Sequence, residues 1–185
     1  LHLSIRRQRQ MCIRDSTIIN GQPKVSKVDT STEIDNLDGS HIISSYGGWS
    51  SRPSVAQYSY DEEGRLVGAK EIQPEVILTD DGYGNVTRTE TKRSYTIVNG
   101  HPKVSTVATR TEIDNLDGSR TISSYEGWSS QTGVVEYTYD EIGLLTGAEE
   151  VKPEVILMDD GYGNVTRTET RRTYTIINGQ AKVTT

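Results

Sequence analysis

The side chains in this sequence that could carry chemistry are mostly carboxylates in short glycine-rich stretches. Asp80-Asp81 and Asp159-Asp160 form two such pairs, and a further acidic stretch reads IDNLDGS. Paired carboxylates serve glycoside hydrolysis when they flank a cleft, and calcium takes about six to eight oxygen ligands. The acidic stretches lack the EF-hand spacing, and Asp is favoured in glycine-rich turns because its side chain accepts backbone hydrogen bonds. We therefore interpret these stretches as turns rather than as catalytic or calcium sites.

No histidine recurs in the sequence at a position where it could act as a nucleophile or general base. The chain repeats itself at an offset of 79 residues, and the position of His41 is then held by Arg120, while His101 corresponds to Gln22 and Gln180. Without a recurring His or Cys, neither a Ser-His-Asp nor a Cys-His arrangement can be assembled. The sequence predicts no catalytic residue, no cofactor-binding residue, no metal ligand and no cofactor, and we expect that the chain is not an enzyme.

Two tryptophans are further candidates for binding. Trp49 and Trp128 recur in SSYGGWSS and SSYEGWSS, each three residues after a tyrosine, Tyr46 or Tyr125. An exposed Trp beside a Tyr offers a large flat face on which a sugar could stack. The alternative, which we favour, is an anchor that packs the loop over the sheet.

An internal repeat organises most of the chain. TIINGQPKVS begins at Thr17, TIVNGHPKVS at Thr96, and TIINGQAKVT at Thr175, and the copies align without insertion or deletion. Between the first two copies, 56 of 79 positions are identical. The predicted organisation is a β repeat unit at 17–95, a second at 96–174, and the truncated start of a third at 175–185.

The first sixteen residues, LHLSIRRQRQMCIRDS, fall outside this repeat. Met11 to Asp15 back-translates as ATG TGT ATA AGA GAC, and Arg6 to Gln10 as CGT CGG CAG CGT CAG, which together resemble a transposase-type sequencing adapter. A signal peptide would need an apolar stretch of about seven to fifteen residues. A basic nucleic-acid arm would explain the charge but not the codon match. We interpret residues 1–16 as an adapter-derived artefact and expect them to be disordered.

The composition argues against several classes of protein. The chain has 20 basic and 26 acidic residues, a net charge of −6; four of the basic and one of the acidic residues lie in 1–15, so the remainder carries −9. An acidic chain without a basic patch binds nucleic acid poorly. Cys12 is the single cysteine, so no disulfide is expected. The longest apolar runs in the chain are four residues. A membrane helix needs about twenty, so no membrane span is expected.

The remaining residues favour β structure, because Thr, Val, Ile and Tyr dominate the runs and Gly, Asn and Asp dominate the breaks. Hydrophobic residues make up 32% of the chain, which is low for a compact ball but sufficient for thin units that pack on their neighbours. We predict an all-β fold of antiparallel hairpin or meander tandem repeats, forming an elongated sheet or solenoid-like array with a 79-residue period. Strands are predicted at 24–34, 41–46, 55–60, 65–72, 75–78 and 86–98.

One hairpin is specified in detail by its turn. The stretch YTIVNGHPKV places Asn99-Gly100 between two extended runs, which predicts a type I′ turn. Pro102 then falls at a non-hydrogen-bonded position, where its missing N–H costs nothing in that ladder. The register pairs Val98 with His101, Ile97 with Pro102, and Tyr95 with Val104.

A second hairpin carries a recurring pattern. Residues 58–66 read YSYDEEGRL and residues 137–145 read YTYDEIGLL, which share Y-x-Y-D-x-x-G-x-L. Tyr58 and Tyr60 would cover one face of a strand, Asp61 would accept backbone N–H groups across the turn, and Gly64 would adopt a positive φ. The pattern resembles the YD repeat of rearrangement-hotspot (Rhs) and teneurin-type proteins, over roughly 30 residues of each unit.

That resemblance implies β-hairpin repeats on bacterial or cell-surface proteins, where they build spiralling shells around a toxin or adhesive barrels. This chain shows no toxin domain and no self-cleavage motif, and other segments separate its YD patterns. We therefore expect a non-catalytic structural or interaction segment of a large exported or cell-surface bacterial protein, adhesin-like or stalk-like. Its expected partners are neighbouring repeats of the same chain and a surface glycan or protein ligand. The alternatives are part of an Rhs-type shell for toxin delivery and the repeat stalk of an enzyme whose catalytic domain lies elsewhere.

Overall fold

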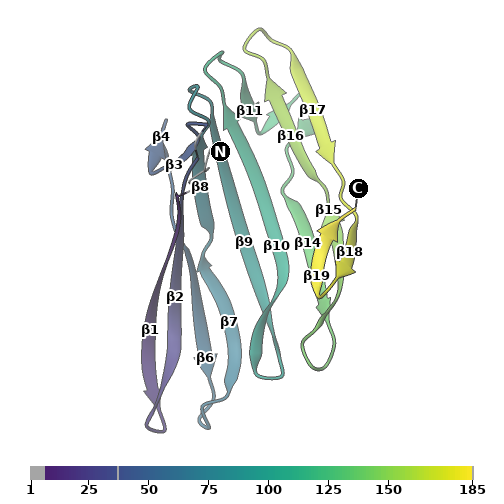
Figure 1. Cartoon of the computed structure of the whole chain (residues 1–185). Helices are drawn as coiled ribbons and strands as arrows, with labels where there is room; N and C mark the ends of the chain where they lie inside the picture. Colours follow the sequence, from purple (N-terminus) through teal and green to yellow (C-terminus); the bar gives the residue numbers. More distant parts are fainter. Residues whose placement is uncertain (1–6, 37, 185) are drawn as a thin grey trace, which may run out of the picture.

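The computed structural model describes residues 7–36 and 38–184, and the regular structure in these residues is entirely β. Thirteen strands form one antiparallel sheet, and three two-strand hairpins stand apart from it. The strands lie side by side from β1 at one end to β17 at the other (Figure 1). The predicted all-β class built from antiparallel hairpins is confirmed. No helix in the described part of the chain is long and apolar enough to span a membrane.

Four long strands form the frame of the sheet: β1 (Arg7–Ile19), β2 (Gln22–Asp35), β9 (Val86–Val98) and β10 (His101–Asp114). The shorter strands of the same sheet are β3 (His41–Ile43), β6 (Ser54–Tyr60), β7 (Leu66–Gln73), β8 (Glu75–Asp80), β11 (Arg120–Ile122), β14 (Gly133–Tyr139), β15 (Leu145–Lys152), β16 (Glu154–Asp159) and β17 (Val165–Thr170). The separate hairpins are β4 (Ser45–Tyr46) with β5 (Trp49–Ser50), β12 (Ser124–Tyr125) with β13 (Trp128–Ser129), and β18 (Tyr174–Ile177) with β19 (Gln180–Val183).

Each of the strands β2 and β10 divides the sheet into two branches. The edge of β2 that faces away from β1 pairs with β6 through Lys27–Thr30 and then with β3 at Asp35. In the same way, β10 pairs with β14 through Thr106–Thr109 and with β11 at Asp114. Strand β3 continues through β8 to β9, whereas β6 pairs with β7. The two branches separate at a point that we call the fork.

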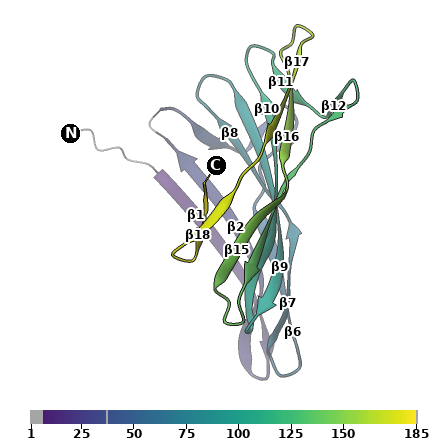
Figure 2. The same ribbon diagram turned by 90° about the vertical axis from the view of Figure 1, so that its right-hand side faces the viewer.

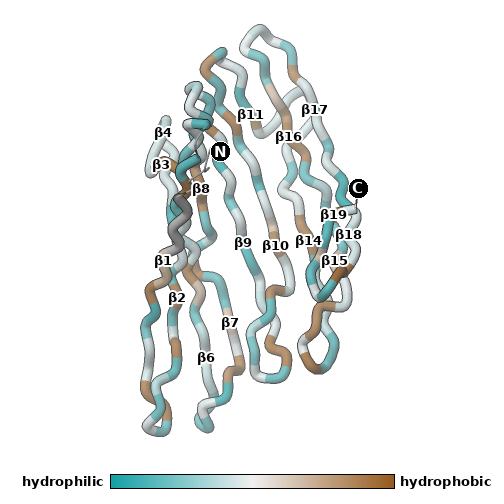
Figure 3. Tube along the Cα trace, in the orientation of Figure 1, coloured by the Kyte–Doolittle hydropathy of each residue, from teal (hydrophilic) through white to brown (hydrophobic). Residues whose placement is uncertain are grey.

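The hydrophobic core is small, and its buried residues lie on β6, β8, β9 and β16. Leu78 on β8, Leu157 on β16 and Val86 on β9 are the largest fully buried side chains. Apolar segments along the chain are short and separated by polar ones (Figure 3), as expected for strands of which one face meets water. The sheet therefore depends on backbone ladders and polar contacts as well as on apolar burial.

The hairpin of β9 and β10 confirms the predicted register. Asn99 and Gly100 both have positive φ, 50° and 73°, as a type I′ turn requires. The ladder adds a feature that the pattern did not predict, a bulge between Val104 and Thr106. The observed pairs next to the turn are Val98 with His101, Ile97 with Pro102, and Tyr95 with Val104.

The YD turn also forms as its residues predict. The Asp61 carboxylate accepts the Arg65 amide at 2.8 Å, Gly64 has φ 79°, and β7 begins at Leu66. The Tyr60 hydroxyl donates to the Val25 carbonyl at 2.8 Å, beside the bulge of β2. The tyrosine of the motif therefore ties the hairpin β6–β7 to the long strand.

Two expectations about local structure are wrong. Residues 7–16 were expected to be disordered but form most of β1, which pairs with β2 down to Arg7 opposite Asp35. The open edge of β2 presents amide and carbonyl groups to whatever chain lies beside it, so this pairing needs no particular side chains. Residues 1–6 of the same segment lie outside the described residues. The predicted strand 41–46 divides at Ser44 into β3 and β4, because β4 turns back to pair with β5.

Candidate functional site

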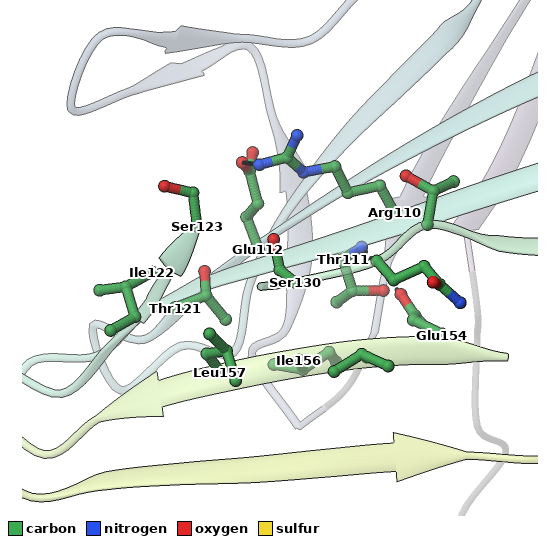
Figure 4. Close-up of a pocket in the computed structure, with 13 residues that line it drawn as sticks. Arg110, Thr111, Glu112, Thr121, Ile122, Ser123, Ser130, Glu154, Ile156 and Leu157 are labelled. Carbon is green, nitrogen blue, oxygen red and sulfur yellow. Dashed lines mark hydrogen bonds and ion pairs between the residues drawn. The ribbon is translucent and has the colours of Figure 1, made fainter. Parts of the chain in front are cut away.

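The sheet encloses space at the forks, so these are candidates for a site. A cavity of about 130 Å³ lies at the second fork, lined from three strands by polar side chains including Arg110, Glu112, Thr121 and Glu154, with Leu157 at its floor (Figure 4). A cavity of about 100 Å³ occupies the corresponding place at the first fork. Ligand pockets usually enclose roughly 300–1,000 Å³, so these two cavities are too small for a substrate of ordinary size. Two other hollows reach that range: one of about 340 Å³ beside Ser54, Glu75 and Arg93, and one of about 660 Å³ lined by residues that include Tyr58 and Tyr60.

A buried carboxylate joins the two branches at the first fork. The side chain of Glu71 on β7 is 1% exposed. Its Oε1 accepts the Ser54 hydroxyl at 2.8 Å, and its Oε2 accepts the backbone amide of Arg93 on β9 at 2.6 Å. Strands β7 and β9 share no ladder in the described sheet, so Glu71 supplies the hydrogen bond that a neighbouring strand would otherwise provide. We call Glu71, Arg93 and Glu75 the clasp.

The guanidinium of the clasp lies between its two carboxylates. Arg93 reaches Glu75 Oε2 at 2.9 Å and Glu71 Oε1 at 3.5 Å. A buried carboxylate is costly unless it is paired and hydrogen-bonded, and both conditions hold for Glu71. Because the carboxylates are held by Arg93, Ser54 and backbone, the clasp is suited to holding strands together.

The second copy repeats the clasp without two of its hydrogen bonds, the one from Ser54 to Glu71 and the one from the Arg93 guanidinium to Glu75. Glu150 Oε2 accepts the Arg172 amide at 2.7 Å, and Arg172 reaches Glu150 and Glu154 at 3.6 and 3.7 Å. The position of Ser54 is held by Gly133, and Glu150 Oε1 is buried without a hydrogen-bond donor. The chain thus contains the same arrangement with and without the serine.

The acidic turns use their carboxylates to hold their own backbone. Asp81 Oδ1 accepts the amides of Tyr83 and Asn85 at 2.8 and 3.1 Å, and its Oδ2 accepts the Asn85 side-chain amide at 2.6 Å. The Asn85 side chain and the Tyr83 amide lower the pKa of Asp81 below its ordinary value. In the described residues, no three His, Cys, Asp or Glu side chains are grouped to hold a metal.

The same turn makes a contact between the two units. The amide of Leu116 donates to Asn85 Oδ1 at 3.1 Å, and the Leu116 side chain lies over Gly84, within 3.4 Å of where a Cβ would stand. A residue larger than glycine at position 84 would meet this side chain, and its φ of 91° already favours glycine. The acidic turn of the first unit therefore contacts a loop of the second unit.

The tryptophans lie in small hairpins beside the sheet. Trp49 pairs with Tyr46 across β4–β5, and Trp128 with Tyr125 across β12–β13, with ring centroids 6.3 and 6.5 Å apart. The β12 hairpin stands out from the sheet (Figure 2), and 45% of the Trp128 surface is exposed. Each ring packs on its hairpin partner, so the pair presents an aromatic surface whose rings are tilted against each other.

The remaining chemically active side chains lie apart from the forks. His41 Nδ1 is 3.1 Å from the Gly39 carbonyl, within its own turn, and His101 is an exposed residue at the β9–β10 turn. Cys12 is a free, exposed thiol on β1. These positions give none of the three residues a catalytic partner among the contacts of the described chain.

Sequence reasoning did not identify the clasp. Its signal was present, because Glu71, Glu75 and Arg93 recur as Glu150, Glu154 and Arg172 in the second copy. Arg93 ends the mixed-charge stretch RTETKR at 88–93, which is typical of a solvated strand, and only the fork buries Glu71. The signal that could have found it is the recurrence of charged residues within short strands that also carry the core.

The comparisons with known proteins add no relative. No family model matches the chain, and the search of curated proteins found no match.

Proposed function

We propose that this chain is a non-catalytic structural and interaction segment, in which β repeat units add side by side into an elongated array with a 79-residue period. The observation that carries the proposal is the junction of the units. Strands β9 and β10 meet along thirteen residue pairs, and the boundary at Thr96 lies within β9. The ladder and the Asn85–Leu116 contact join the units.

The distribution of the core supports this architecture. Val55, Ala56, Val76, Leu78 and Val86 are the buried hydrophobic residues of the first unit, and Val155 and Leu157 those of the second. Both units contain buried apolar side chains, and the junction consists of the β9–β10 ladder, which pairs Val86 with Asp114, and of the contact between Leu116 and Gly84. Nearest-neighbour contacts of this kind build length and no common core.

The biological setting of the proposal rests on the YD resemblance and the composition. We place the segment in a large exported or cell-surface bacterial protein, adhesin-like or stalk-like, outside the cell. Its partners are the neighbouring repeats of the same chain and a surface glycan or protein ligand, for which the exposed Tyr–Trp hairpins offer an aromatic face. The alternatives are part of an Rhs-type shell for toxin delivery, favoured by the YD turns, and the stalk of an enzyme whose catalytic domain lies elsewhere.

Small-angle scattering tests the array directly. Chains of two, four and six 79-residue units, without residues 1–16, are expected to show a longest dimension that grows nearly in proportion to unit number. A radius of gyration that rises only with about the 0.38 power of length, as for one compact globule, would falsify the array. A dimension that saturates around a hollow volume would support the shell in its place.

A further inference from the structure

The hollow of about 660 Å³ lies beside the tyrosines of the first YD hairpin. Its volume falls within the usual range of ligand pockets, roughly 300–1,000 Å³. Its walls include Val28 on β2, Tyr58 and Tyr60 on β6, Leu66 at the start of β7, and Pro102 on β10. Both tyrosines are half-buried, so the hollow is bounded by aromatic and aliphatic surface that is still open to a ligand.

A polar hollow adjoins this one along β2. Val28 pairs with Ala56 and Thr30 pairs with Ser54. Alternate residues of a strand lie on one face of a sheet, so Tyr58 shares this face with Val28 and Thr30. The hollow of about 340 Å³ is lined by residues that include Thr30 and Ser54. Hydroxyl groups are therefore available next to the aromatic walls.

The charged residues that line the larger hollow are all basic. They are Arg14, Lys24 and Arg65, and no carboxylate lines it among the residues that the structure describes. Arg65 is held by Asp61 and Glu63, whereas no ion pair reaches Lys24 in the described part of the chain. Arg14 lies outside the repeat, so Lys24 is the free cation of the repeat unit. A cationic lining on a chain of net charge −6 favours an anionic ligand.

The lysine and both tyrosines recur in the second unit, as Lys103, Tyr137 and Tyr139. Lys103 Nζ lies 5.9 Å from the centroid of the Tyr139 ring. Its Cε is 3.0 Å from where a Cβ would stand at Gly143, and Lys24 Cε is 3.3 Å from the equivalent point at Gly64. In both units the lysine stem therefore lies against the glycine of the YD turn, near the tyrosines.

We propose that this face binds a glycan with an acidic sugar, whose ring packs on Tyr58 and whose carboxylate meets Lys24. Tyr137 and Lys103 offer the same contacts in the second unit. A tyrosine supplies flat, rigid apolar area for the C–H face of a sugar, and the adjoining hydroxyls suit a ligand rich in hydroxyls. The proposal rests on the proposed function, because it specifies the glycan expected there, and it places that glycan on the YD tyrosines and not on the Tyr–Trp hairpins.

Titration calorimetry of the full chain tests the ligand class with two probes that differ in charge. A trimer of galacturonate carries carboxylates, and the matching trimer of galactose carries none. The galacturonate trimer is expected to bind, and more weakly as salt is added, because exposed charges are screened. The galactose trimer is expected to bind clearly less well.

Charge-reversal variants test the lysines. K24E/K103E is expected to weaken binding of the galacturonate trimer about tenfold or more, because the charge that meets the carboxylate is reversed. The matched control is K70E/K92E, which changes the net charge by the same amount. Lys70 and Lys92 are exposed, and each is adjacent in sequence to a residue of the tyrosine face, so its own side chain lies on the opposite face. This control is expected to bind as the parent chain does.

Ring variants test the tyrosines. Y58A/Y137A is expected to abolish binding, whereas Y58F/Y137F keeps the rings and most of the affinity. Circular dichroism checks that the variants keep the sheet, and the phenylalanine and lysine variants give a result even if the alanine variant unfolds.

Several results would overturn the proposal. They are an absence of binding, equal binding of the galactose trimer, equal losses in K24E/K103E and K70E/K92E, unchanged binding by a folded Y58A/Y137A chain, and loss of binding in W49A/W128A alone. The scattering test of the array measures shape only. An elongated array that binds no galacturonate would therefore overturn this site alone, and a compact globule would overturn the array whatever the chain binds.

Discussion

The hydrogen bond from Ser54 to Glu71 offers a quantitative test of the clasp. Replacing Ser54 by Ala removes the donor at 2.8 Å from Oε1 while the carboxylate stays buried. A hydrogen bond to a charged group contributes about 1.5–3 kcal/mol. Glu71 keeps the Arg93 amide and the Arg93 guanidinium, so the loss falls short of full desolvation. We expect Ser54→Ala to lower the free energy of unfolding by about 2 kcal/mol.

Urea denaturation followed by circular dichroism measures this loss, and a double-mutant cycle assigns it. In a Glu71→Gln background the same serine replacement is expected to cost clearly less, because the charged acceptor is gone. Ser59→Ala is the matched control, since Ser59 lies on the same strand but is exposed, and its cost is expected to stay within about 0.5 kcal/mol. A loss for Ser54→Ala as small as that of Ser59→Ala, or equal losses in both backgrounds, would refute the role assigned to Glu71.

Three further outcomes are expected. Leu78→Ala should destabilise the chain by about 2–5 kcal/mol in urea denaturation, because the side chain is fully buried; a cost under 1 kcal/mol would contradict its place in the core. Tyr60→Phe should cost about 0.5–1.5 kcal/mol through loss of the bond to the Val25 carbonyl, and a neutral result would mean that this bond is not made in solution. Because the pKa of Asp81 is lowered on folding, its stabilisation is complete above the ordinary value of 3.8 and is lost as the pH falls below it; Asp81→Asn should flatten the stability profile between pH 5 and pH 2, and an unchanged acid limb would argue against the turn.

The hairpins were predictable from sequence because their causes are local. Asn99-Gly100 imposes a turn with positive φ at both residues, and the register beside it follows from counting. The strand 86–98 and the YD turn were predicted with the bounds and contacts that the structure has. In each case a few adjacent residues determine the backbone path, whatever the rest of the chain does.

The N-terminal strand shows the limit of such reasoning. Codon matching and the break in the repeat predicted disorder for residues 1–16, yet Arg7–Ser16 lie in β1. Their side-chain pattern gave no sign of a strand, since the pairing is provided by the free edge of β2. Whether the edge of a strand is free depends on the whole sheet, and the sequence of the strand that pairs with that edge does not show it.

The repeat, the turns and the alternation of the strands follow from residue identity and spacing along the chain. The places where β2 and β10 divide the sheet depend on how distant strands meet, and so does the burial of Glu71 against Arg93 while nearby charges stay in water. Strand β7 meets β9 without a ladder, so a carboxylate must satisfy an amide that lies 22 residues away in sequence. Burial is a property of neighbours brought together by folding, and for this reason the clasp appears only in three dimensions.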